Sequence, residues 1–505
     1  MKQSSFMRQN DAFAWYMEDD PELRSTVVGV AWLDHPPNWD DLIARMDRAT
    51  RLVPSFRQRP VEVPGRLATP RWTTDPHFDI TWHMRRVNAP RPKTPETVLH
   101  LAEQAAMTGF DRTRPLWEFT VVEGLRDDRA AMVMKMHHSL TDGIGGVQLA
   151  AHLFDLTPGR HRVGVLPVAP LGEMLTAAHL VGEAVMEQAG VARDTLVGTL
   201  RRAPRATARA ARHPVGTLSE LGETARSIGR TVRPLPAPLS PIMTGRGPGR
   251  AFHMVTVGFD GLKQSASAAG STLNDAFMAG LTGGLRLYHE RHAAGVHDLV
   301  VTLPISIRTP DDLPGGNRIT LMRLRVPASI VDPVARMHAI GRICRAARAE
   351  RSLALTDAIA GGLNLVPTAF IASMLKHVDF LASDVPGFTR PIYLCGAHVS
   401  GYYAFGPTIG AALNATLFSY DGRCCIGLNV DVDAVPDHDL LVECLHEGFD
   451  EVIGRTERGG GRRCRELAGA GTAAPPPPPP PPPMTRAAAS AGSGARRART
   501  GVPAC

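Results

Sequence analysis

The chain has 505 residues, of which 44% are hydrophobic and 21% are charged, and its formal net charge at pH 7 is +7. At roughly 150 residues per domain this length predicts about two to three domains, and the composition is typical of a globular protein rather than a disordered or fibrous one. The sequence argues against a membrane-spanning helix, since no stretch reaches the ~18 uncharged apolar residues that one needs.

The positive charge lies in two segments. Residues 193–233 carry nine Arg and three acidic residues, and residues 461–505 carry seven Arg and one acidic residue. The rest of the chain is therefore net negative, since 7 − 12 = −5. Nucleic-acid-binding proteins concentrate Lys and Arg on a folded face. We therefore expect no nucleic-acid partner, whereas Arg-rich segments could meet an anionic lipid surface.

The N-terminus, MKQSSFMRQNDAFAWYMEDD, lacks the apolar core of a secretory signal peptide. We therefore expect a cytoplasmic protein. The seven Cys are odd in number and show no C-x-x-C spacing. This pattern predicts neither a disulfide framework nor a zinc site, and it indicates small buried side chains instead.

Residues 1–160 predict an N-terminal lobe of strands and helices. β-Branched or alternating runs predict strands, and 3.6-residue spacing predicts helices. The strands are expected at 25–33, 116–124 and 130–136, and the helices at 39–53 and 97–107. Residues 161–250 follow as a helical, Arg-rich connector. Its Arg201, Arg202, Arg205 and Arg209 could dock on anionic lipid, or the helix could simply be solvated between the lobes.

Residues 251–457 predict a second lobe of the same kind. Strands are expected at 252–259, 299–307, 319–326, 413–420 and 423–432, and helices at 333–350 and 438–453. Residues 458–505, with nine consecutive prolines, predict a disordered tail. The sequence thus predicts an α/β protein with two lobes.

Two adjacent histidines stand where the strand at 130–136 ends. The stretch HHSLTDG (137–143) predicts a turn, and IGGVQLAAHLF opens a helix. A histidine at such a strand end can act as a general base, because its pKa lies near neutrality. Asp142 could orient the imidazole or hold the loop through an arginine, and Gly143 permits backbone conformations that other residues resist.

The surrounding sequence narrows the chemistry. No serine lies in a G-x-S-x-G context, and no cysteine is paired with these histidines, so a covalent acyl-enzyme is not indicated. No nearby Glu or Cys completes a metal-ligand set. Direct transfer assisted by a base is the simpler hypothesis.

Several motifs resemble a known family. HHSLTDG fits the HHxxxDG signature of acyltransferases that resemble chloramphenicol acetyltransferase and the condensation domains of peptide synthetases. Four further stretches resemble segments of the bacterial wax ester synthase/acyl-CoA:diacylglycerol acyltransferase family: FDRTRPLWEFTVVEGL (110–125), LNDAFMAGLTGGLR (273–286), LPISIRTPDDLPGGNRIT and SDVPGF (383–388). The resemblance runs in order from about residue 10 to 456.

The resemblance implies both fold and activity. It implies two chloramphenicol-acetyltransferase-like lobes, with mixed sheets and packed helices, around an inter-lobe tunnel. Family members transfer a long-chain acyl group from acyl-CoA, a substrate rather than a cofactor, to diacylglycerol or a fatty alcohol. By resemblance His138 is the base, His137 supports the site and Asp142 is mainly structural. We expect no metal or cofactor, and peripheral association with the inner face of the membrane or with lipid droplets.

Residues outside the histidine motif have candidate roles as well. Asn274 is a candidate donor from the second lobe, or part of a helix cap formed by the STLND run. Arg308 is a candidate partner for Asp142, and Trp117 is expected in the core. Asp384 departs from the asparagine usual in the family, which puts a hydrogen-bonding role of that loop in doubt.

Two other functions compete with this hypothesis. One is a condensation-type acyltransferase that takes its acyl group from a carrier protein. The other is a non-catalytic lipid-droplet protein that binds through its Arg-rich segments. The choice between diacylglycerol and fatty alcohol stays open at this point.

Overall fold

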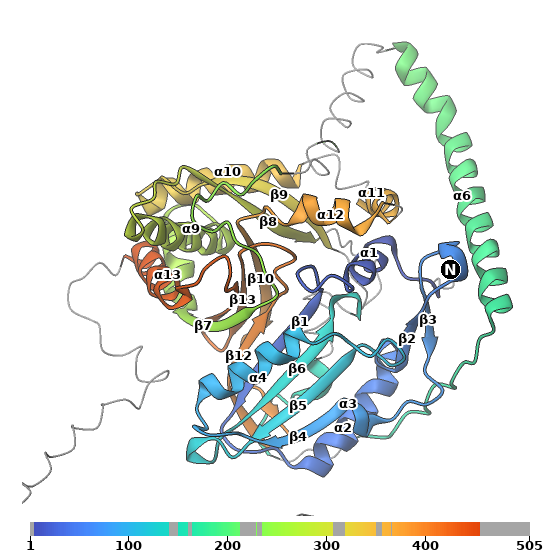
Figure 1. Ribbon diagram of the computed structural model, residues 1–505, viewed down its shortest axis with the longest axis horizontal. Coiled ribbons are helices and arrows are strands. Elements are labelled where there is room, and N and C mark those ends of the chain that lie inside the picture. The colour runs from blue at the N-terminus through green and yellow to red at the C-terminus, as the bar shows by residue number, and fades with distance from the viewer. Residues whose placement is uncertain are drawn as a thin grey trace, which may run out of the picture. The chain divides into compact units, whose positions relative to one another are not determined.

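Two six-stranded mixed sheets organise the structure, a computed structural model that describes residues 5–140, 150–159, 164–212, 229, 235–306, 319–349, 356–364 and 366–454 (Figure 1). The first sheet has the order β11-β12-β1-β6-β5-β4, and the second has the order β7-β14-β13-β10-β8-β9. A separate hairpin pairs β2 (Gln58–Val61) with β3 (Arg71–Thr74).

The first sheet carries the strand that ends at the histidines. Its members are β1 (Thr26–Leu33), β4 (Met84–Asn88), β5 (Trp117–Glu123), β6 (Ala130–His137), β11 (Tyr393–Leu394) and β12 (Ala397–Phe405). The strands predicted near 25, 116 and 130 are confirmed as β1, β5 and β6. Strand β6 is buried along its whole length between antiparallel β1 and β5, which explains its continuous apolar run.

Helices of the first half are α1 (Gln9–Met17), α2 (Trp39–Leu52), α3 (Ile80–His83) and α4 (Pro95–Met107). The two predicted helices are confirmed as α2 and α4. Asn38 caps α2 by accepting the Asp41 N–H at 3.0 Å.

Helix α6 spans Ala177–Arg212 within the predicted connector. Its start docks on the first lobe, since Ala184 is buried and Glu183 pairs with Arg71 at 2.6 Å.

The second sheet consists of β7 (Arg250–Gly258), β8 (Asp298–Ser306), β9 (Ile319–Pro327), β10 (Phe380–Phe388), β13 (Leu413–Tyr420) and β14 (Arg423–Asp431). The helices of this half are α8 (Phe259–Ala268), α9 (Leu273–Arg291), α10 (Pro333–Arg348), α11 (Thr356–Leu363), α12 (Thr368–Leu375) and α13 (His438–Ile453). The strands and helices predicted here are confirmed.

Helices α9 and α13 pack unusually close together. A Cβ on Gly448 would lie 2.2 Å from the Gly284 nitrogen, so only glycine fits at this contact. Arg336 of α10 links both helices from the side: it donates to the Ala279 carbonyl of α9 at 2.9 Å and to the partly buried Glu451 of α13 at 2.9 Å. The glycines of the LNDAFMAGLTGGLR stretch therefore serve helix packing in the second lobe.

The two halves are not separate in space. Strand β12, from the second half, pairs antiparallel with β1 and places Phe405 opposite Val28. The Phe405 ring stacks on Phe252 of β7, with centroids 4.2 Å apart. The division of the chain at residues 160 and 250 stays a prediction, but it did not anticipate that residues 393–405 would join the first sheet.

The predicted α/β class with two sheet-containing lobes is confirmed, while the inter-lobe tunnel stays a prediction.

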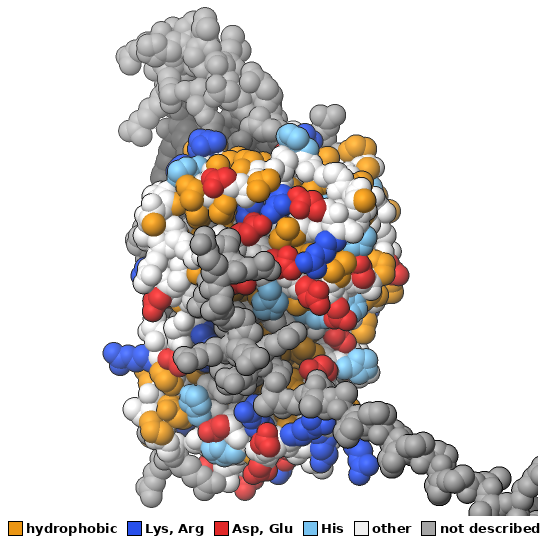
Figure 2. Space-filling model, turned by 90° about the vertical axis from the view of Figure 1, so that its left-hand side faces the viewer, with side chains coloured by type: hydrophobic (Ala, Val, Ile, Leu, Met, Phe, Trp, Pro, Cys, Tyr) orange, Lys and Arg blue, Asp and Glu red, His pale blue; other side chains and the backbone are white. Residues whose placement is uncertain are grey.

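In the part of the chain that the structure describes, no helix is long and apolar enough to cross a membrane. The five cysteines in that part are buried, as the sequence predicts. On the face of the molecule that Figure 2 draws, acidic and basic side chains are interspersed among the described residues.

Candidate active site

The end of β6 is held on both sides by backbone hydrogen bonds. The His137 N–H donates to the Leu116 carbonyl at 3.0 Å, and the His138 N–H donates to the Ser25 carbonyl at 2.9 Å. A short 3-10 turn, η4 (His138–Leu140), then leaves the sheet and packs against α1. The two histidines therefore sit where a rigid strand becomes a turn.

His137 is fully buried and its ring orientation is defined. Its Nδ1 accepts the Ser139 N–H at 3.1 Å and lies 2.7 Å from the Ser139 hydroxyl oxygen. In the neutral ring the hydrogen is then on Nε2, which lies 3.4 Å from the Glu18 Oε2. The rings of Trp15 and Phe110 pack edge-on against it.

His138 is half-buried, unlike its neighbour. It begins η4, and the fixed backbone on either side limits where its side chain can go. A half-buried imidazole can exchange protons with a bound substrate and still be shielded from bulk water. This arrangement suits a general base, which must reach a hydroxyl to within ~3 Å.

Comparison with known proteins assigns the chain. Residues 7–277 match the wax ester synthase/diacylglycerol acyltransferase catalytic domain, and residues 315–452 match the C-terminal domain of the same family. The chain belongs to the wax ester synthase/diacylglycerol acyltransferase family. The resemblance inferred from the motifs is confirmed, and the chain is an acyltransferase.

Two relatives come from Mycobacterium tuberculosis. Rv2484c, a candidate diacylglycerol O-acyltransferase, is 34% identical over 446 residues, which are 86% of this chain and 89% of the relative. Rv1760, described in the same way, is 30% identical over 88% of this chain and 89% of its own length.

Solved structures share the fold. The wax ester synthase/diacylglycerol acyltransferase of Marinobacter aquaeolei is 22% identical and superposes with a TM-score of 0.58 over 89% of this chain and 99% of its own. The first condensation domain of the calcium-dependent antibiotic synthetase is 14% identical, with a TM-score of 0.56 over 90% of this chain and 96% of its own. These two matches support the predicted lobes, and the family match favours the lipid branch.

The structure describes only part of the predicted site of this acyltransferase. His137 and His138 are adjacent, as described above. Asp142, Gly143 and Arg308 lie outside the described residues, so their roles stay predictions.

Asn274 lies at the start of α9, which packs against α8, α10 and α13. The cap of α9 is made by its neighbours: Thr272 accepts the Asp275 N–H at 3.2 Å, and Asp275 accepts the Thr272 N–H at 3.0 Å. The capping hypothesis thus holds for the STLND run through Thr272 and Asp275. A catalytic role of Asn274 stays a prediction.

Glu18 lies against His137, and the sequence did not reveal this contact. It lies directly after α1, is 5% exposed, and accepts the Ser25 N–H at 3.1 Å. In the sequence it belongs to an acidic MEDD run that indicated only the lack of a signal peptide. Nothing local marks it, because its contact with His137 spans more than 100 residues.

A small polar cavity lies near the end of β6. Its lining includes Arg24 and Thr26 from the first half and Arg250 and Asn429 from the second, and Thr26 is paired with His137 across β1 and β6. Its volume of about 30 Å³ matches roughly one water molecule. The cavity is too small for an acyl chain, so it is not the predicted tunnel.

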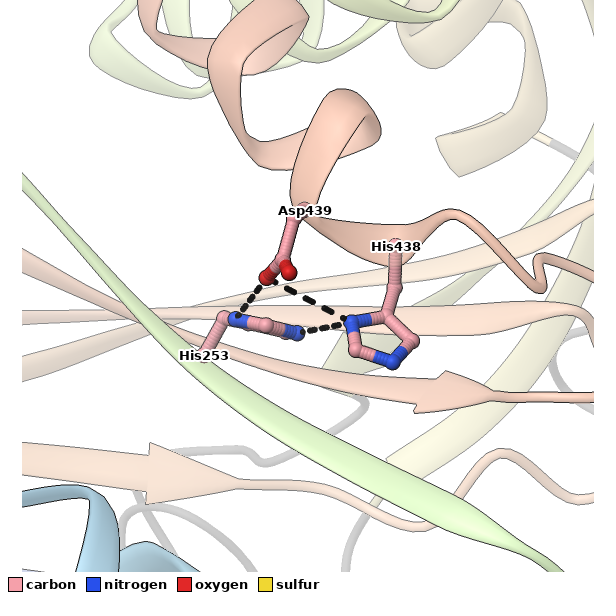
Figure 3. A group of neighbouring side chains, drawn as sticks. All are labelled: His253, His438 and Asp439. Atoms are coloured by element: carbon pink, nitrogen blue, oxygen red, sulfur yellow. Dashed lines mark hydrogen bonds and ion pairs between the residues drawn. The ribbon is translucent and has the colours of Figure 1, made fainter. Parts of the chain in front are cut away.

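One group among the described residues has the composition of a metal site, and it shares no residue with the histidine motif. Figure 3 shows His253 of β7 facing His438 and Asp439 at the start of α13. His253 Nε2 and His438 Nδ1 are 2.9 Å apart, which is a hydrogen bond between the two rings. The Asp439 carboxylate is 89% exposed and lies 3.6 Å from His438. Burial, and secondarily the neighbouring His438, lower the pKa of His253 to about 4.

Proposed function

We propose that this acyltransferase moves a long-chain acyl group from acyl-CoA to the hydroxyl of diacylglycerol or of a fatty alcohol. The proposal rests on one observation in a chain of this family. His138 is half-buried at the end of β6, where backbone hydrogen bonds fix the strand. Diacylglycerol is the first candidate acceptor, because it appears in the names of the mycobacterial relatives.

In the proposed reaction His138 acts as general base. Its imidazole takes the proton of the acceptor hydroxyl as the oxygen attacks the thioester carbonyl. The carbon–sulfur bond breaks, and the imidazolium returns the proton to the departing thiolate. The products are an ester and free coenzyme A, and the mechanism requires neither a covalent acyl-enzyme nor a metal.

Four further residues complete the proposal: Asp142, Gly143 and Arg308 lie outside the described part of the chain, and Asn274 lies within it. Asp142 and Gly143 would shape the turn after His138, with Arg308 as the partner of Asp142. Asn274 would contribute from the second lobe. The acyl chain would lie in a tunnel between the lobes.

Peripheral contact with a membrane or lipid droplet is also proposed, because the acceptors are lipids. Helix α6 supports it: Val185, Met186, Val191 and Leu196 are apolar and exposed along the helix. Exposed apolar side chains on a long Arg-rich helix are typical of segments that adsorb to anionic lipid.

The test measures release of coenzyme A from palmitoyl-CoA by purified protein, with dipalmitoylglycerol or hexadecanol as acceptor. We expect release only with an acceptor, formation of the matching ester, and loss of both in His138→Ala. Wild-type protein that is inert with both acceptors would contradict the proposal and favour a carrier-bound donor or a lipid-coat role.

A further inference from the structure

We infer that Glu18 is a positioning residue of the active site, which holds the turn carrying His138 through two routes at once. One route runs through the ring of His137 and the other through the backbone of Ser25. The geometry rests on described contacts, while the consequence for catalysis rests on the proposed function.

The Glu18 carboxylate is buried, and its Oε2 makes the contacts with Ser25 and His137. Oε2 accepts the Ser25 N–H at 3.1 Å and faces His137 Nε2 at 3.4 Å. Oε1 makes no hydrogen bond with the described residues, and the Arg24 Nε, 4.0 Å away, offsets the charge only in part. Burying a carboxylate is costly unless it is paired and hydrogen-bonded, so this one is held in place by specific partners.

The first route passes through the His137 ring. Because the Ser139 N–H donates to Nδ1, the neutral ring carries its hydrogen on Nε2, and the Glu18 Oε2 lies 3.4 Å from this nitrogen, an electrostatic contact rather than a hydrogen bond. The other tautomer would lose the acceptor for Ser139 and set a lone pair against a negative charge. Glu18 and the Ser139 N–H therefore favour the same tautomer, and that tautomer holds the Ser139 amide one residue beyond His138.

The second route passes through Ser25. Glu18 accepts its N–H, and the Ser25 carbonyl accepts the N–H of His138 at 2.9 Å. One side chain thus fixes the backbone both before and after the base. The rings of Trp15 and Phe110 close the space around His137, so water cannot easily replace the carboxylate.

The variant Glu18→Gln should keep the contact with Ser25 and disturb the contact with His137. An amide can still accept from Ser25 through its oxygen, but its NH₂ group then faces the Nε2–H of His137, and two donors oppose each other. We expect His137 to change tautomer and the turn to shift. A misplacement of about 1 Å can cost on the order of 100-fold in rate, so kcat should fall about 10- to 100-fold with KM nearly unchanged.

The experiment combines ¹⁵N NMR of the His137 ring with steady-state kinetics on the full chain. Asp19→Asn is the matched control, because this neighbouring side chain is 72% exposed. The inference is supported if Glu18→Gln moves the His137 nitrogen shifts to the other tautomer and lowers kcat, while Asp19→Asn does neither. It is overturned if the shifts and kcat of Glu18→Gln match the wild type.

A second variant guards against misfolding. Glu18→Asp keeps the negative charge, but its side chain is shorter. We expect it to retain the wild-type tautomer in part, and to lose less activity than Glu18→Gln. Equal loss in the two variants, with unchanged His137 shifts, would indicate a purely structural residue and overturn the inference. If the wild type transfers no acyl group, the proposed function fails, but the NMR result still decides whether Glu18 holds His137.

Discussion

Two histidine pairs lie in the two lobes, and they differ in their surroundings. His137 and His138 are neighbours in sequence, and the first is fully buried against a buried carboxylate. His253 and His438 are brought together only by the fold, and the carboxylate beside them is 89% exposed. A buried carboxylate is a fixed hydrogen-bond acceptor, whereas an exposed one is hydrated and screened by salt.

The contrast separates two uses of histidine. In the first pair the polar contacts hold a ring and a turn in one arrangement, as a catalytic base requires. In the second pair each ring finds its main partner in the other, and burial keeps His253 neutral. Similar residues are therefore proposed to serve catalysis in one lobe, whereas in the other they pair with each other at the edge of a sheet.

The largest effect should come from removing the base. His138→Ala should lower kcat about 10²- to 10⁴-fold, the usual contribution of general-base catalysis. The matched change in the second pair, His438→Ala, should leave the rate within about threefold. Release of coenzyme A measures both. Comparable losses in the two variants would break the contrast between the pairs.

The support beneath the first pair should matter next. Trp117 follows Leu116, whose carbonyl accepts the His137 N–H, and it is fully buried with its Nε1–H donating to the Phe56 carbonyl at 2.9 Å. Trp117→Ala should lower the free energy of unfolding by about 3–5 kcal/mol. Urea denaturation checks this. Trp39→Ala, at a half-buried position, serves as control and should cost clearly less.

A smaller, pH-dependent effect is expected from the second pair. The folded-state pKa of His253 is about 4, below its ordinary value of 6.5, so the unfolded chain binds more protons between these values. The contribution of His253 to stability is complete above pH 6.5 and is lost as the pH falls toward 4, by at most ~1.4 kcal/mol per pH unit.

Replacing His253 tests whether its titration lowers stability as the pH falls. His253→Asn should lose stability less steeply than the wild type between pH 6.5 and 4.5, measured by urea denaturation at several pH values. His438 and Asp439 are the titratable groups that act on this ring, and both remain in the variant. Identical slopes would show that burial does not depress the pKa of His253.

The smallest effect should follow metal removal. The proposed base mechanism needs no metal, and the rings in Figure 3 are hydrogen-bonded to each other. Acyl transfer should therefore be unchanged, within experimental error, after dialysis against EDTA. A loss of activity that zinc restores in the wild type but not in His438→Ala would assign the second pair a role in catalysis.

Much of the fold could be predicted from local patterns. The apolar runs near 25, 116 and 130 became β1, β5 and β6, and the helical spacing near 39 and 97 became α2 and α4. Trp117 was expected in the core and is fully buried. Such features follow from side-chain periodicity over a few residues, which is visible in one sequence.

The partners of those elements could not be predicted in the same way. Strand β12 has an alternating pattern that fits any half-buried sheet position, and only the tertiary structure decides that it pairs with β1 instead of a strand of its own lobe. Strand pairing depends on contacts between distant residues, which local periodicity does not encode.

By itself, the sequence determined the family and most of the secondary structure, because these depend on residues close together in the chain. It also predicts the chemistry of His137 and His138. Only the tertiary structure decided that Glu18 faces His137 and that His253 meets His438. Burial and hydrogen-bond partners give these side chains their roles, and both are properties of the folded chain.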